Sequence, residues 1–153
     1  MRLFDLLNEL ALSVGIGGVT PDETGCVTLL FDDEHEVTFM PDEENDAVCF
    51  QCEVGDASRL GFDECRTLLE ASFSQTDGAA FSIQADLQKV VLWKRYGEFA
   101  SLNSFEKAIN DFLGQVVAWK QRLALGDFGV TEESAASSSH QYMPNLTPNF
   151  IQV

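Results

Sequence analysis

The chain has 153 residues, of which 45% are hydrophobic, and its formal net charge at pH 7 is -16. A chain of this length is typical of one domain that buries a hydrophobic core without a disulfide scaffold. So strong a negative charge repels phosphate backbones and anionic lipid surfaces, and we expect neither nucleic acid binding nor membrane insertion.

The first predicted element is an amphipathic helix over residues 3–14. Acidic residues interrupt its apolar pattern near the first residue, which is not typical of a secretory signal, and we expect a cytoplasmic protein. Phe4 and Leu12 fall outside the apolar stripe, and the segment Gly15–Gly18 ends the helix. The stripe and its flanks consist of Leu3, Leu6, Leu7, Leu10, Ala11 and Val14.

A three-strand antiparallel meander is predicted next. The strands are short, roughly alternating and rich in β-branched and aromatic residues, and they span residues 26–31, 36–40 and 48–53. Acidic turns separate them, at residues 32–35 and at residues 41–46. A sheet this small needs an amphipathic element to cover one face.

A second helix is predicted over about residues 63–74. Phe62, Leu69 and Phe73 share one side, and Cys65 and Leu68 widen the apolar arc. A helix that is apolar over so much of its circumference has two packing partners.

A second hairpin follows, with strands over residues 80–85 and 89–96. Its second strand is the most concentrated basic stretch in the sequence, with Lys89, Lys94 and Arg95.

The third helix has the strongest periodicity of the sequence. Asn103 with Glu106 makes a possible capping box, Ser101 is the alternative N-cap, and Gly126 ends the helix. Its apolar residues recur over five turns as Phe105, Ile109, Phe112, Val116, Trp119 and Leu123.

Beyond Gly126 the composition becomes rich in serine, which predicts one folded domain over residues 1–126 and a flexible tail over residues 127–153. The terminal residues 150–153 are apolar again, and a frayed terminus is favoured over a docking segment. The predicted order is αβββαββα, an α+β fold with three helices on a twisted antiparallel sheet.

Catalytic and metal motifs are weak in this sequence. Cys49 and Cys52 match C-x-x-C, but residues three apart in a strand point to opposite faces, so these thiols should not meet. His35 and His140 lack a metal-spaced partner, and the acidic segment 42–46 lacks the calcium-loop spacing. We therefore expect no enzyme activity, no metal and no cofactor.

More apolar surface is present than one small core is expected to bury. Phe4, Leu12, Leu68 and either Val91 or Trp93 remain after the helices and sheet are packed. Surplus apolar surface on a very acidic chain indicates association with another protein.

The order of these elements resembles the class I type III secretion chaperones, the Tir chaperone family, over residues 3 to about 125. The similarity lies in loose hydrophobic patterns together with the size and acidity. These are Leu6-Leu7-x-x-Leu10-Ala11-x-x-x-Gly15-Ile16, then Asp22-Glu23-x-Gly25-x-x-x-Leu29-x-Phe31-Asp32, then Leu68-Leu69, and finally Phe112-Leu113 with Trp119 and Arg122-Leu123.

The resemblance implies a homodimer in the bacterial cytoplasm, with an interface built from Leu68, Leu69 and Phe73 of the second helix, so that Leu68→Glu breaks the dimer. It also implies that the N-terminal region of a secreted effector wraps the dimer in extended form, pairing with a sheet edge. The effector-binding positions carried over to this sequence are Phe4, Leu7, Val27, Leu29 and Trp93.

Two other hypotheses remain. One is a chaperone-like regulator that sequesters a basic antiactivator of secretion gene expression. The other is an acidic enzyme or metal protein, which would require a shielded carboxylate or a bound metal.

Overall fold

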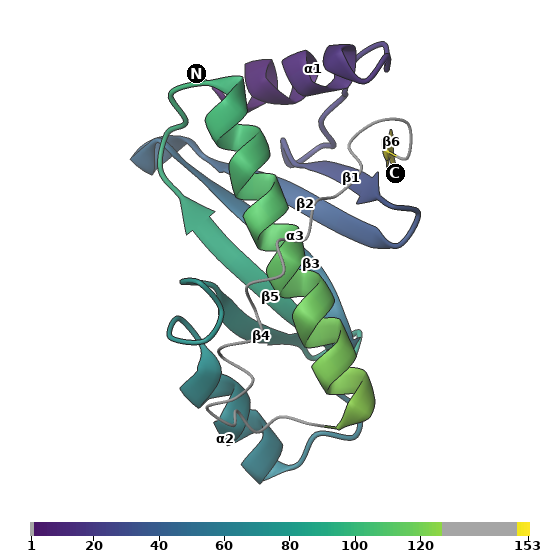
Figure 1. Cartoon of the computed structure of the whole chain (residues 1–153), viewed down its shortest axis with the longest axis vertical. Coiled ribbons are helices and arrows are strands. Elements are labelled where there is room, and N and C mark those ends of the chain that lie inside the picture. Colours follow the sequence, from purple (N-terminus) through teal and green to yellow (C-terminus); the bar gives the residue numbers. More distant parts are fainter. Residues whose placement is uncertain (1, 127–149) are drawn as a thin grey trace.

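The computed structural model describes residues 2–126 and 150–153. Three helices and a six-stranded antiparallel sheet with strand order β4-β5-β3-β2-β1-β6 form an α+β fold, which confirms the predicted class (Figure 1). The elements are α1 (Leu3–Ser13), β1 (Val27–Phe31), β2 (His35–Asp42), the 3-10 turn η1 (Glu43–Asn45), β3 (Ala47–Asp56), α2 (Phe62–Ala71), β4 (Ala80–Gln84), β5 (Lys89–Tyr96), α3 (Leu102–Leu125) and β6 (Phe150–Gln152).

The meander is longer than the sequence predicted. The turn predicted over residues 41–46 is present but begins later, at Glu43, because Pro41 lies in β2 and pairs with Val48 of β3. His35 also belongs to β2, where it pairs with Phe31, although the sequence placed it in the acidic turn. The turn between β1 and β2 has three residues, Asp32, Asp33 and Glu34, and the Glu34 amide donates to the Phe31 carbonyl at 3.1 Å. Asp32 and Asp33 adopt positive φ values of 53° and 55°, a conformation that aspartate tolerates in turns.

Two helices, α1 and α3, cover the inner face of the sheet, and α3 crosses the strands (Figure 1). Phe50 of β3 lies at the centre of an aromatic cluster, with ring centroids 4.8 Å from Phe39, 4.5 Å from Tyr96 and 5.7 Å from Phe112. Gly55 permits the close approach of α3, because a Cβ there would lie 2.9 Å from a methyl carbon of Leu123. Side chains alternate between the two faces along each strand, and the apolar ones lie on the inner face that the helices cover.

Local capping sets the ends of the helices. The α3 N-cap is Ser101, whose hydroxyl accepts from the Ser104 amide at 3.3 Å, so the predicted Asn103 capping box is wrong. The C-cap of α3 is Gly126 with φ 69°, as predicted. At the end of α1 the Ile16 amide donates to the Ala11 carbonyl at 2.8 Å, which is the Schellman pattern that a glycine at position 15 permits.

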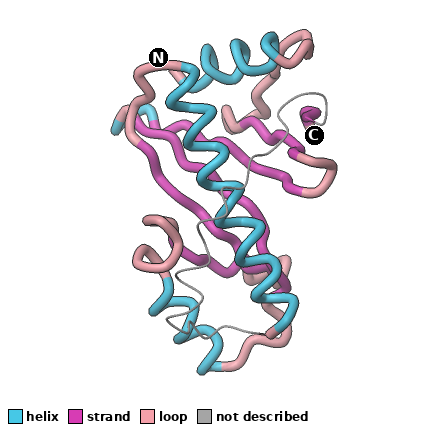
Figure 2. Tube along the Cα trace, viewed as in Figure 1, coloured by secondary structure: helices cyan, strands magenta, loops and turns pink. Residues whose placement is uncertain are grey.

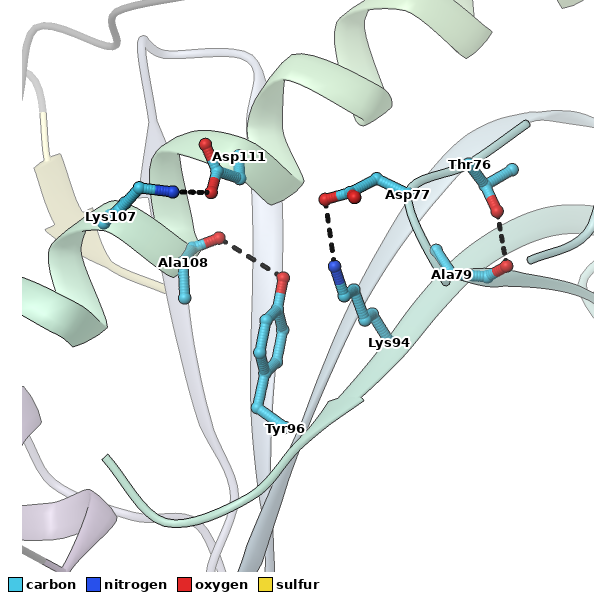
Figure 3. Close-up of polar contacts among 8 residues, drawn as sticks. All are labelled: Thr76, Asp77, Ala79, Lys94, Tyr96, Lys107, Ala108 and Asp111. Carbon is cyan, nitrogen blue, oxygen red and sulfur yellow. Dashed lines mark hydrogen bonds and ion pairs between the residues drawn. The ribbon is translucent and has the colours of Figure 1, made fainter. Parts of the chain in front are cut away.

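Polar contacts join the second hairpin to α3 and to the turn after α2 (Figure 3). Tyr96 of β5 donates its hydroxyl to the Ala108 carbonyl of α3 at 3.4 Å, and Lys94 lies 3.0 Å from the carboxylate of Asp77 in the turn after α2. The loops, drawn in pink in Figure 2, connect the helices to the ends of the sheet.

The end of the chain adds a strand that the sequence did not predict. Residues Phe150–Gln152 form β6, which pairs antiparallel with β1 (Figure 1). The predicted flexibility of residues 127–149 concerns a segment outside the described residues.

Candidate protein-binding surfaces

The outer face of the sheet carries an open hollow of about 260 Å³. Four strands supply its lining, and none of the described helices contributes to it. Trp93 of β5 is half-buried there, beside Val91. The lining residues are Met40, Cys49, Gln51, Ser82, Gln84, Val91 and Trp93. This mixture of an aromatic ring, aliphatic side chains and amides suits a peptide side chain better than a charged group.

The predicted effector-binding residues divide between surface and core. Trp93 lies at the hollow, and Phe4 of α1 is 37% exposed. In contrast Leu7, Val27 and Leu29 are at most 1% exposed, because they point to the inner face between α1 and the sheet. In this conformation a bound chain cannot reach those three side chains. The sequence pattern could not separate a covered apolar stripe from an apolar binding patch.

The predicted interface helix also presents a different set of side chains from the one expected. Leu68 is buried in the core cluster, whereas Leu69 is 71% and Phe73 is 64% exposed. The helix ends at Ala71, not near residue 74 as predicted, so Phe73 lies in the turn after it, with a positive φ of 66°. Phe62, at the start of α2, is exposed on the same helix. One end of the molecule therefore carries large apolar side chains in solvent around α2 (Figure 1).

The basic stretch of β5 does not form a free cationic patch. Lys89 pairs with Glu53 at 2.9 Å and Arg95 with Asp42 at 2.7 Å, and Lys94 pairs with an acid as described above. These pairs leave the surface dominated by the remaining acidic residues, in keeping with the net charge of -16.

A buried histidine contact lies at the start of β2, directly after the turn from β1. His35 is 3% exposed, and its Nδ1 lies 2.9 Å from Nζ of Lys120 in α3. Burial, and then the charge of Lys120, lower the pKa of His35, while Glu34 and Asp32 act in the opposite direction. The neutral ring is therefore favoured, with Nδ1 accepting from the lysine, and this contact joins β2 to α3.

The cysteines are arranged as the strand geometry predicted. Cys52 faces the core and Cys49 lines the outer hollow, so the two thiols do not meet. Burial raises the pKa of Cys52 to about 12 and also raises the pKa of Cys49, and both thiols stay protonated at neutral pH.

Within residues 2–126 and 150–153, no group of three or more His, Cys, Asp or Glu side chains is arranged to hold a metal ion. Among the helices of the described chain, none has the length and apolar character needed to cross a membrane.

Solved structures of similar fold were found by comparison. A chain of the ExsC–ExsE complex superposes with a TM-score of 0.68 and 25% identity, covering 80% of this chain and 97% of that one. A chain of the HopA1–SchA chaperone–effector complex has a TM-score of 0.62 and 11% identity, covering 76% and 91%. The Yersinia pestis type III secretion chaperone SycH in complex with a stable fragment of YscM2 has a TM-score of 0.56 and 18% identity, covering 80% and 99%.

No curated protein sequence matched significantly. A sequence model of the Tir chaperone protein (CesT) family, however, matches residues 5–120, which span the core from α1 to the last turns of α3. With this match and the shared fold, the chain belongs to the Tir chaperone protein (CesT) family of type III secretion chaperones.

Proposed function

We propose that this chain is a homodimeric chaperone of the bacterial cytoplasm that binds the N-terminal segment of a type III secreted effector and keeps it soluble and competent for export. The family match over residues 5–120 is the observation that carries the proposal. Structural neighbours solved as chaperone–effector complexes support it.

The open outer face of the sheet supports a client-binding role. Trp93 offers apolar contact, above the buried Val91 and beside the amides of Gln51 and Gln84, which can bind a peptide main chain. Phe4 on α1 provides a second contact. Leu7, Val27 and Leu29 do not contact the client directly; their buried side chains hold α1 and β1 in place.

An extended segment suits this fold for a physical reason. Main-chain hydrogen bonds to an edge strand supply affinity that is largely independent of sequence, and alternate side chains in apolar hollows fix the register. The client segment stays unfolded while bound, and no nucleotide hydrolysis is needed.

The surface formed by α2 and the turn after it supports the homodimer. Leu69 and Phe73 are large apolar side chains in solvent, and burying them against a second copy would remove them from water. Leu68 contributes from inside, by packing α2 onto its own core.

The alternative is a chaperone-like regulator that sequesters an antiactivator of secretion gene expression. The likeness to a chain of the ExsC–ExsE complex, at 25% identity, is consistent with it. The acidic surface favours a basic partner, which is the feature that distinguishes this candidate.

Native mass spectrometry of the tagged chain, purified from its own host, tests both. Two copies with one larger polypeptide, bound through the N-terminal region of that polypeptide, are expected. Trp93→Asp should reduce the recovery of the client about tenfold or more, because a charge would have to be desolvated in the hollow. Leu125→Asp, at an exposed position on the last turn of α3, is the matched control and should not.

A dimer with a small basic protein would favour the regulator instead. A metal-loaded monomer would contradict both candidates.

A further inference from the structure

The β1 edge of the sheet is occupied by the last residues of the same chain. Leu29, Leu30 and Phe31 pair with Gln152, Ile151 and Phe150, respectively. The amide of Val153 also donates to the Thr28 carbonyl at 3.2 Å. Without β6, the edge strand of the described sheet on this side would be β1, with its outward main-chain groups open to another strand.

A side-chain contact fixes the register of β6. The amide of Thr20, in the connection between α1 and β1, donates to Oε1 of Gln152 at 3.0 Å. The side-chain nitrogen of Gln152 donates in return to the Thr20 carbonyl. This two-way contact resembles main-chain pairing, and it holds Gln152 opposite Leu29. A one-residue slip would break it.

The pairing is short compared with the strand that it covers. β6 pairs with three of the five residues of β1, and Val153 is 53% exposed. A longer extended segment could pair along the whole of β1 and could therefore bind more tightly than β6. Because β6 is covalently joined to α3, it binds as an intramolecular ligand, and even a weak strand would occupy the edge for much of the time.

We propose that residues Phe150–Val153 are an intramolecular occupant of the β1 edge and that an extended client segment must displace them. The competition rests on the proposed function, whereas the occupancy does not. The chemistry of the site is main-chain pairing with β1 plus a primary amide side chain at the Thr20 position. The opposite edge, β4, is not covered by a strand of the described chain.

Occupancy is tested by amide hydrogen exchange on the full chain without any client. The bond from Val153 to Thr28 places Leu30 and Ile151 at the next hydrogen-bonding pair, because such pairs alternate along antiparallel strands. Ile151→Pro should therefore speed exchange at Leu30 roughly tenfold. Ser138→Pro places the same residue elsewhere in the tail and should leave exchange at Leu30 unchanged.

Equal exchange at Leu30 in the wild type and in Ile151→Pro would overturn the occupancy. Protection that disappears on dilution would also overturn it, because the strand would then come from a second copy.

Competition is tested by comparing the full chain with a variant that ends at residue 149, using two ligands: a peptide and the recovered client. A fluorescent peptide with the sequence of residues 147–153 should bind this truncated chain about threefold to tenfold more tightly than the full chain, because the edge is no longer occupied. The client recovered in the purification described above should show a similar gain.

Equal peptide affinity for the truncated and full chains would overturn the proposal. A client that binds both chains equally would overturn the competition while leaving the chaperone function intact. If no client is recovered, the proposed function fails, and the exchange and peptide results still decide the occupancy.

Discussion

At the scale of single residues, His35 is the clearest case of a side chain whose role depends on its partners. The sequence placed it in an acidic turn, where a histidine would titrate near its usual pKa. In the fold it is buried against Lys120, and its pKa is lowered. Because two positive charges at this distance repel, the contact requires the neutral ring.

We predict a pH dependence of stability from this contact. The unfolded chain binds a proton at His35 more readily than the folded chain, so the stabilisation is complete above the unfolded pKa of about 6.5 and is lost as the pH falls towards the lowered folded pKa. His35→Asn keeps an acceptor for Lys120 but cannot titrate. The difference in free energy of unfolding between the wild type and His35→Asn should therefore change with pH.

Urea unfolding between pH 5 and 7.5 measures this difference. His140→Asn, in the tail, should keep the slope of the wild type, and the comparison removes the common effect of the many carboxylates. Parallel curves for the wild type and His35→Asn would contradict the prediction.

At the scale of elements, α2 carries large apolar side chains that its own chain does not cover. Its inward side chain Leu68 packs into the core, while Leu69 on the helix and Phe73 in the turn after it face solvent. Leu68→Glu would therefore place a charge in the core and unfold the chain, so it cannot report on the dimer alone.

We predict that Leu69→Glu converts a dimer into a folded monomer, because the glutamate would be solvated in the monomer but desolvated in the interface. Light scattering after size exclusion measures the mass, and far-UV circular dichroism checks the fold. Leu12→Glu, on α1 at the other end of the molecule (Figure 1), changes an exposed leucine in the same way and should leave the dimer intact. A monomeric wild type would contradict the interface itself.

At the scale of the whole molecule, the aromatic cluster joins the sheet to α3. Phe50 is fully buried, and its ring lies 5.8 Å from that of Phe105 and 5.7 Å from that of Phe112. No ring of this cluster belongs to α2. The packing of β2 and β3 against α3 therefore does not depend on the proposed interface.

We predict that Phe50→Ala costs about 3–5 kcal/mol of the free energy of unfolding, through lost burial and the cavity that remains. Chemical unfolding monitored by circular dichroism measures the cost. Leu12→Ala, at a position 67% exposed, should change the free energy by about 0.5 kcal/mol or less. A similar small change for Phe50→Ala would mean that the cluster does not hold the fold.

Much of the fold could be predicted because its signals are local. The periodicity of α3, the glycine at position 126 and the alternation in β1 and β3 each depend on neighbouring residues in the chain. The helix order, the meander and the second hairpin followed from these, as did the opposite orientations of Cys49 and Cys52. Where two local signals competed, as for Ser101 and Asn103 at the start of α3, the pattern alone did not choose correctly.

The binding surfaces depended on the tertiary structure. An apolar residue is covered or exposed according to what packs against it. Leu7, Val27 and Leu29 are buried in the core formed by α1, α3 and the sheet, whereas Leu69 is exposed. The pairing of β6 with β1 joins residues more than 100 positions apart, which no local pattern encodes. Thus the sequence by itself determined the elements from α1 to α3, their order and the family, because short-range propensity and periodicity set them. Only the tertiary structure decided which apolar side chains remain available to a partner and which edge the chain's own terminus occupies.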